Sequence, residues 1–181
     1  MSSQKYVFFL TRSAIPYKKE FIQYVFDRRG WTGNGFKFSL AEKEKDANVY
    51  IHFKSNAELE ELFGDVPSFQ DEMKGLSVTD STNAPHDIKI YFNLENWKTP
   101  PDVFTVVENG KNTIKGSKRL KIYRQYLVQH EVGHAIGFDH PEKIEYAKTC
   151  FPCHPMQQQT KGTSMCRANP WISEIKQNEL K

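Results

Sequence analysis

The sequence predicts a single α+β domain, and three observations lead to this fold class. Five short segments combine β-branched and aromatic residues, or alternate apolar with polar side chains, as strands do. Other segments place apolar residues three or four positions apart, as amphipathic helices do. No repeat, low-complexity tract or Gly/Ser linker divides the 181 residues, and a chain of this length can bury most of its apolar surface without a disulfide or metal.

The composition excludes several classes of function. The 38% hydrophobic and 13% aromatic fractions argue against disorder. The net charge is only +3 and the basic residues are scattered, so no nucleic-acid partner is expected. No stretch approaches the roughly 18 apolar residues of a membrane span, and "YVFFL" (6–10) is too short for the core of a signal peptide. We expect a monomer without membrane contact and without an export signal in this sequence.

The chain is predicted to open with a strand followed by a helix. "KYVFFLT" (5–11) is rich in β-branched and aromatic residues, which favours a buried strand. After Pro16, residues 17–29 place apolar side chains at helical spacing, and Gly30 is the expected stop.

The middle of the chain alternates strands with loops. A short helix is predicted at 56–64 with Asn56 as its cap, and a hairpin with its turn at Asn109-Gly110 within a loop-like stretch. The remaining strands are predicted at 36–41, 48–53, 76–82 and 87–94.

The strongest helix pattern covers residues 118–137, and Gly137 is its expected stop. About forty residues without strong periodicity follow it. The side chains that recur every three or four positions are those of Leu120, Tyr123, Leu127, His130 and His134.

This helix ends in "HEVGHAIGFDH", which predicts a metal site. His130 and His134 lie one turn apart on a helix, so both imidazoles can point at one ion. Glu131 is rotated by about 100° from His130, which keeps it out of the ligand set but near a water on the metal. It is therefore the candidate general base.

Gly137 and His140 complete the predicted site. Gly137 permits the left-handed conformation that ends a helix, and the resulting turn can return His140 to the same ion. Three neutral imidazoles and one open position are typical of a catalytic zinc site rather than a structural one.

Two bland explanations compete with this hypothesis. Chance would give the H-E-x-x-H pattern in roughly one such chain in a hundred, and the added glycine and third histidine lower this to a few in a hundred thousand. Alternatively, the histidines could be satisfied core residues of the helix. For His52 and His86, structural or surface roles are favoured.

The same residues carry a family resemblance. "HEVGHAIGFDH" is similar to the H-E-x-x-H-x-x-G-x-x-H signature of the metzincin clan of zinc metallopeptidases. With "YRQYLVQHEVGHAIGFDHP", "PMQQQTKG" and "CRANPW", the chain most resembles an uncharacterised bacterial family of metzincin-like domains of unknown function. The close match covers about residues 123–171, and the strand at 90–97 adds weaker support.

The resemblance implies a specific architecture. It predicts one catalytic domain over 1–181, with a twisted mixed sheet of about five strands and two long helices in an upper part (1–137). A small irregular lower part (138–181) follows, and the active-site cleft lies between the two. An edge strand, for which 76–82 is the candidate, would pair with extended substrate. The hairpin within "VFTVVENGKNTI" (103–114) is the candidate to overhang the cleft.

Metzincins have a methionine turn beneath the metal, and the resemblance assigns it here to Met156 rather than Met165. Some metzincins carry a tyrosine zinc ligand two residues after this methionine. Gln158 occupies that position, so a tyrosine ligand is not expected.

The three cysteines leave several alternatives open. The resemblance implies a disulfide between Cys166 and either Cys150 or Cys153. The rival hypothesis is a second, structural zinc site made by the three cysteines and His154. A C-x-x-C redox motif is weaker, because no strand-to-helix context supports it.

The predicted function is that of a zinc-dependent metalloendopeptidase with one catalytic Zn²⁺, acting on extended peptide or protein substrates with Glu131 as the base. A zinc-binding protein without peptidase activity and a zinc hydrolase of a small amide are the alternatives. The sequence identifies no compartment, although the family resemblance suggests a secreted protein.

Overall fold

A five-stranded mixed sheet forms one layer of the computed structural model, which describes residues 5–67, 74–108, 112–141, 152–162 and 166–174. The strand order is β2-β1-β3-β5-β4, and only β4 runs antiparallel to its neighbour. The predicted sheet of about five strands is thus confirmed, with β4 at one edge. The strands are β1 (Lys5–Leu10), β2 (Lys37–Leu40), β3 (Val49–Lys54), β4 (Val78–Asn83) and β5 (Asp87–Asn93).

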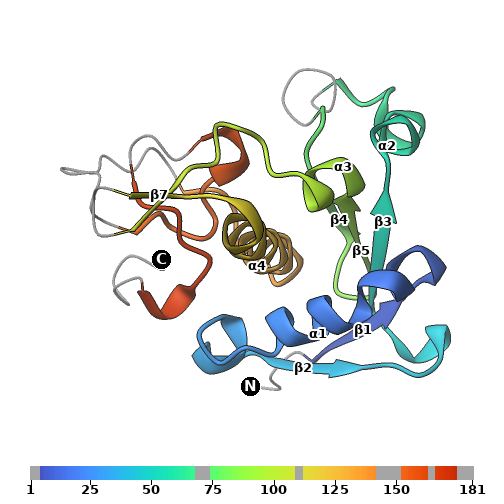
Figure 1. Ribbon diagram of the computed structural model, residues 1–181. Coiled ribbons are helices and arrows are strands. Elements are labelled where there is room, and N and C mark those ends of the chain that lie inside the picture. Colours follow the sequence, from blue (N-terminus) through green and yellow to red (C-terminus); the bar gives the residue numbers. More distant parts are fainter. Residues whose placement is uncertain (1–4, 68–73, 109–111, 142–151, 163–165, 175–181) are drawn as a thin grey trace.

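One long helix crosses the molecule, α4 (Gly116–Ala135), which matches the strongest helix pattern in the sequence. Figure 1 shows α4 and the shorter α1 (Lys18–Val25) on the same side of the five-stranded sheet. The main core lies between them and the sheet. It includes Phe8, Phe21, Ile51, Phe92, Tyr126 and Val128.

The expectation of a second long helix is wrong. Residues Arg12–Tyr17 form a 3-10 turn, and α1 that follows has only 8 residues. The helix ends at Val25, whose carbonyl accepts from Thr32 Oγ1 at 2.9 Å instead of from a helical N–H. Beyond it, the Asp27 carboxylate accepts from the backbone N–H of Arg29 at 2.9 Å, a local bond that competes with helix continuation.

Short elements complete the fold. Helix α2 (Asn56–Phe63) is capped by Ser55 rather than Asn56, because Ser55 and Glu58 form a reciprocal capping box. The predicted hairpin is present as β6 (Val106–Glu108) and β7 (Asn112–Ile114), while its turn at Asn109-Gly110 lies outside the described residues. The others are α3 (Leu94–Lys98) and 3-10 turns at Trp31–Asn34, Glu44–Asp46, Gln159–Lys161 and Ile172–Glu174.

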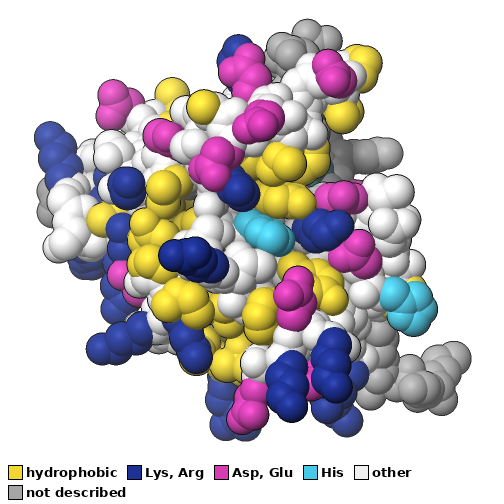
Figure 2. All heavy atoms as spheres, turned by 90° about the vertical axis from the view of Figure 1, so that its right-hand side faces the viewer, with side chains coloured by type: hydrophobic (Ala, Val, Ile, Leu, Met, Phe, Trp, Pro, Cys, Tyr) yellow, Lys and Arg dark blue, Asp and Glu magenta, His cyan; other side chains and the backbone are white. Residues whose placement is uncertain are grey.

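The outer face of the sheet is partly solvent-exposed. Phe9, Tyr50 and His52 are half-buried there, and α2 covers one end through Leu59. Figure 2 shows hydrophobic side chains on this side of the molecule among both positive and negative ones. Among the described helices, none is long and apolar enough to cross a bilayer.

Candidate metal centre

Three imidazoles converge at the end of α4. His130 and His134 come from the helix, and His140 returns from the turn that follows it. The Nε2 atom of His140 lies 3.2 Å from that of His130 and 3.1 Å from that of His134. The turn is made by Gly137, whose φ of 95° lies in the left-handed region that favours glycine. The structure therefore brings the three predicted ligands together.

Backbone carbonyls set the tautomers of the two helical histidines. Nδ1 of His130 donates to Pro155 O, and Nδ1 of His134 donates to Phe138 O, both at 2.8 Å. A carbonyl oxygen can only accept, so each Nδ1 carries the proton and each Nε2 of a neutral ring presents a lone pair to the cluster. Oriented imidazoles of this kind are typical of metal-bound histidines.

The surroundings keep all three rings neutral. Burial, together with the neighbouring imidazoles, holds the pKa of His130 well below its usual range. Burial also lowers the pKa of His134. For His140, burial and the nearby His134 and Lys161 lower the pKa to about 4. Neutral imidazole is the form that binds a metal ion.

Glu131 lies beside the cluster with its side chain almost fully buried, at 4% exposure. Its Oε2 accepts a hydrogen bond from Thr79 Oγ1 at 2.7 Å. Burial raises the pKa of the carboxyl to about 7, and the bond from Thr79 acts in the opposite direction. Glu131 is thus a carboxyl group that lines the cleft and whose pKa lies near neutral pH.

The cleft has a volume of about 470 Å³ and opens over the histidines. Its lining includes Thr79 of the edge strand β4 and Ser77 before it, and also Gln158 and Thr160. The predicted edge position of this strand is confirmed.

A turn holding Met156 supports the cluster from below. Its Pro155 carbonyl holds His130, and Met156 itself is completely buried. The Met156 sulfur lies against Gly133 of α4, so closely that a Cβ at this glycine would overlap it. Gly133 therefore provides the close approach between helix and turn, a role that its position inside a helix pattern could have signalled.

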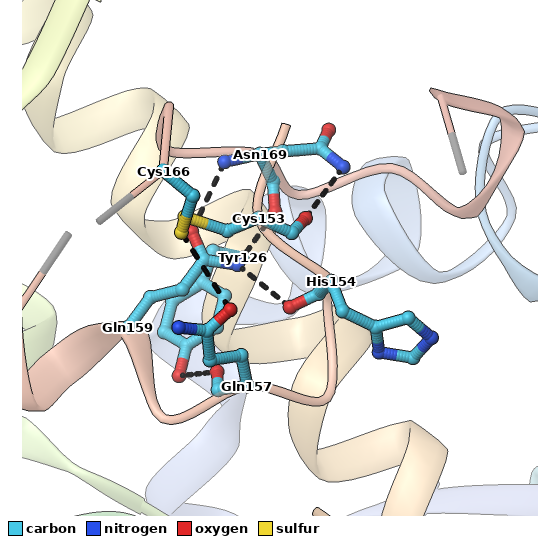
Figure 3. Close-up of a disulfide and its surroundings, with 7 residues drawn as sticks. All are labelled: Tyr126, Cys153, His154, Gln157, Gln159, Cys166 and Asn169. Carbon is cyan, nitrogen blue, oxygen red and sulfur yellow. Dashed lines mark hydrogen bonds between the residues drawn. A yellow bond between two sulfur atoms is a disulfide. The ribbon is translucent and has the colours of Figure 1, made fainter. Parts of the chain in front are cut away.

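A disulfide and a buried amide pair fix this turn, as Figure 3 shows. Cys153 is bonded to Cys166, so the hypothesis of a second zinc site at the cysteines is wrong. Once paired, the two sulfurs are no longer thiolate ligands. The remaining cysteine, Cys150, lies outside the described residues, as does Met165.

The amide pair is Gln159 and Asn169, both buried. The Asn169 N–H donates to Gln159 Oε1 at 3.0 Å, and Gln159 Nε2 donates to Asn169 O at 2.8 Å. Asn169 Nδ2 also donates to Cys153 O at 3.0 Å. The Tyr126 hydroxyl donates to Gln157 O at 3.1 Å, which connects α4 to the turn that holds Met156.

A second support, from the first half of the chain, was not anticipated from the sequence. Trp31 Nε1 donates to Gln129 O at 2.7 Å, and the Gln129 side chain donates to Tyr24 O at 2.7 Å. The Trp31 ring stacks on Phe138, just before the third histidine, with ring centroids 4.5 Å apart. These contacts fasten the loop after α1 to the metal-site helix and its turn.

The other three histidines do not belong to the cluster. His52 is half-buried on the sheet and stacks on Tyr91, and His86 is exposed in a turn. His154 is buried, and its Nδ1 accepts from the Met156 N–H at 3.1 Å. It therefore shapes the methionine turn.

Together, the fold and the site define an α+β domain with a three-histidine cluster, extending from the buried His130 to the exposed His140, that could hold a metal ion. The chain belongs to the family described as "Protein of unknown function (DUF3152)", whose model matches residues 19–179. No curated protein matches the chain.

Proposed function

We propose that this protein is a zinc-dependent endopeptidase of the metzincin type. The observation that carries the proposal is the convergence of three imidazole Nε2 atoms beside a buried carboxyl group in an open cleft. The resemblance of the motif around His130 to the metzincin signature supports the same conclusion.

The donor set fits zinc. Zn–N distances of about 2.0–2.1 Å in a tetrahedral site place two ligand nitrogens about 3.4 Å apart. The Nε2 separations of 3.1 and 3.2 Å are close to this edge length. Three histidine ligands leave a fourth position free, as in catalytic rather than structural zinc sites.

The reaction proposed is hydrolysis of a peptide bond. Zinc held by the three histidines would polarise the substrate carbonyl and lower the pKa of water towards about 7. Glu131 accepts a proton from the attacking water and then donates it to the departing amine. The burial of Glu131 in the lining of the same cleft as the three histidines supports this role.

The substrate proposed is an extended peptide. β4 is the last strand of the sheet on this side and borders the cleft, so its free edge can pair with a peptide backbone. Such pairing binds main-chain atoms and therefore gives little sequence preference.

A peptide-mixture assay tests the proposal. Zinc-loaded protein and its Glu131→Ala variant are incubated with a diverse peptide library, with and without chelator, and the products are identified by mass spectrometry. We expect cleavage by the wild type that chelator stops and that Glu131→Ala lowers by about 10²–10⁴-fold. Cleavage that is equal in the variant, or no cleavage at all, would refute the peptidase assignment.

Metal content tests the ligands separately from activity. His134→Ala should lose stoichiometric zinc, whereas His86→Ala, a matched change at an exposed histidine, should retain it. Stoichiometric zinc in His134→Ala would contradict the ligand assignment. Zinc binding without hydrolysis would favour the non-proteolytic alternative.

A further inference from the structure

We propose that Thr79 is a positioning residue that holds the Glu131 carboxylate for proton transfer. This inference rests on the proposed function. Thr79 Oγ1 lies 2.7 Å from Glu131 Oε2 and 3.1 Å from the backbone carbonyl of the same residue. A hydroxyl has one proton, and the shorter distance assigns it to the carboxylate.

The strand register directs Thr79 at the helix. Thr79 is paired with Ile90, which is fully buried in the main core, whereas its neighbour Val78 is paired with Tyr91 on the outer face. Alternation along the strand therefore turns Thr79 alone of these two toward α4. The contact joins positions 52 residues apart and depends on the tertiary fold.

Glu131 has little other restraint. Among the described residues, no other side chain donates a hydrogen bond to its carboxylate. The residue is only 4% exposed, so bulk water has little access to replace the hydrogen bond from Thr79. With Oε2 held by Thr79, Oε1 remains for the reacting water. The hydroxyl thus fixes which oxygen acts as the base.

The contact also links the base to the strand expected to bind substrate. Thr79 belongs to β4, which lines the cleft. The same strand would therefore hold both the bound peptide and the Glu131 carboxylate, and this fixes their positions relative to each other. Small misplacements of a catalytic group cost rate, so this link serves the chemical step rather than substrate affinity.

Thr79→Val tests the hydroxyl with little change in shape, and Thr79→Ser restores it. Losing one hydrogen bond to a charged group corresponds to a fall of about 10- to 100-fold in kcat. KM and zinc content should change little, because the lost bond does not contact the metal ligands or the substrate. Thr79→Ser should return kcat to within about 3-fold of the wild type. Thr99→Val, the same change at an exposed threonine that does not line the cleft, is the matched control.

A binding probe keeps the inference testable without turnover. Acetohydroxamate carries a zinc-binding oxygen pair and an acidic proton that a nearby base can accept. Calorimetry should show about 10-fold weaker binding to zinc-loaded Thr79→Val than to wild type, with no further loss when Thr79→Val is added to Glu131→Ala. Unchanged binding and kcat in Thr79→Val would overturn the inference.

The two proposals fail in different ways. If the wild type cleaves no peptide but binds the probe, the peptidase proposal fails and the probe alone decides the role of Thr79. If the zinc-loaded wild type neither cleaves peptides nor binds the probe, both are refuted. A kcat loss that Thr79→Ser does not restore would show a packing role instead.

Discussion

Replacing Gly133 by alanine tests how closely the methionine turn approaches the metal-site helix. The new Cβ would overlap the Met156 sulfur and lie 2.9 Å from Trp31 Cζ2 and 3.0 Å from Met156 Cε. Met156 and Trp31 are 0% and 1% exposed, so neither can move aside into solvent. Overpacking of this kind costs about 1–3 kcal/mol, while alanine returns about 1 kcal/mol of helix propensity. Because the overlapped atoms are fully buried, the overpacking cost should lie in the upper half of its range, and we expect a net loss of about 1–2 kcal/mol.

Urea unfolding followed by circular dichroism, with chelator present, measures this loss without a metal contribution. The corresponding fall in Tm is roughly 2–8 °C for a domain of this size. Zinc affinity should also fall, by about 10-fold or more, because the displaced turn carries the Pro155 carbonyl that holds His130. Equal or greater stability of Gly133→Ala would refute the packing argument.

A double-mutant cycle assigns the loss to one contact. Met156→Ala alone should cost about 2–5 kcal/mol because it leaves a cavity. In the double variant the Cβ of the new alanine at position 133 occupies part of that space, so the two costs should fall short of additivity by about 1 kcal/mol. Strict additivity would place the strain elsewhere.

Three further predictions concern stability. Ser55→Ala removes the capping box of α2 and should lower the free energy of unfolding by about 0.5–2 kcal/mol in urea titrations, and no change would contradict the cap assignment. Replacing Cys153 and Cys166 by serine opens a loop with a sequence separation of 13, so we expect a loss of about 3 kcal/mol, and a non-reducing peptide map should contain this pair in the wild type. Burial lowers the pKa of His52 to about 4, below its unfolded value. Its contribution to stability is therefore present above about pH 6.5 and is lost as the pH falls toward 4. Urea titrations should show that His52→Phe loses less stability over this interval than the wild type, and parallel profiles would refute this.

The sequence predicted the three-histidine cluster because its parts are local. Two ligands lie one turn apart on α4, and the third follows a glycine whose positive φ makes the turn. Nothing distant is needed to bring His130, His134 and His140 together. Strands β1, β3 and β5 were likewise predictable, because each alternates or concentrates apolar side chains within six or seven residues.

The supports of the cluster were not predictable in this way. Thr79, Pro155 and Trp31 reach the helix from 52, 25 and 98 residues away, and no local pattern encodes such contacts. The length of α1 was overestimated for a related reason. Apolar spacing continued past Val25, but side-chain bonds from Thr32 and to Asp27 favoured a different backbone path.

The same supports explain why the site needs both halves of the chain. The ring of His130 is oriented by a carbonyl in the methionine turn, and that turn is anchored by the Cys153–Cys166 disulfide and by Asn169. A metal ion binds only when the imidazoles are oriented, so each contact that fixes the turn also stabilises the bound state. By linkage, a metal ion bound there would in turn stabilise the segment around Met156. On the proposed function, the eleven-residue motif supplies the ligands, while residues that do not touch the ion set part of the affinity of the site.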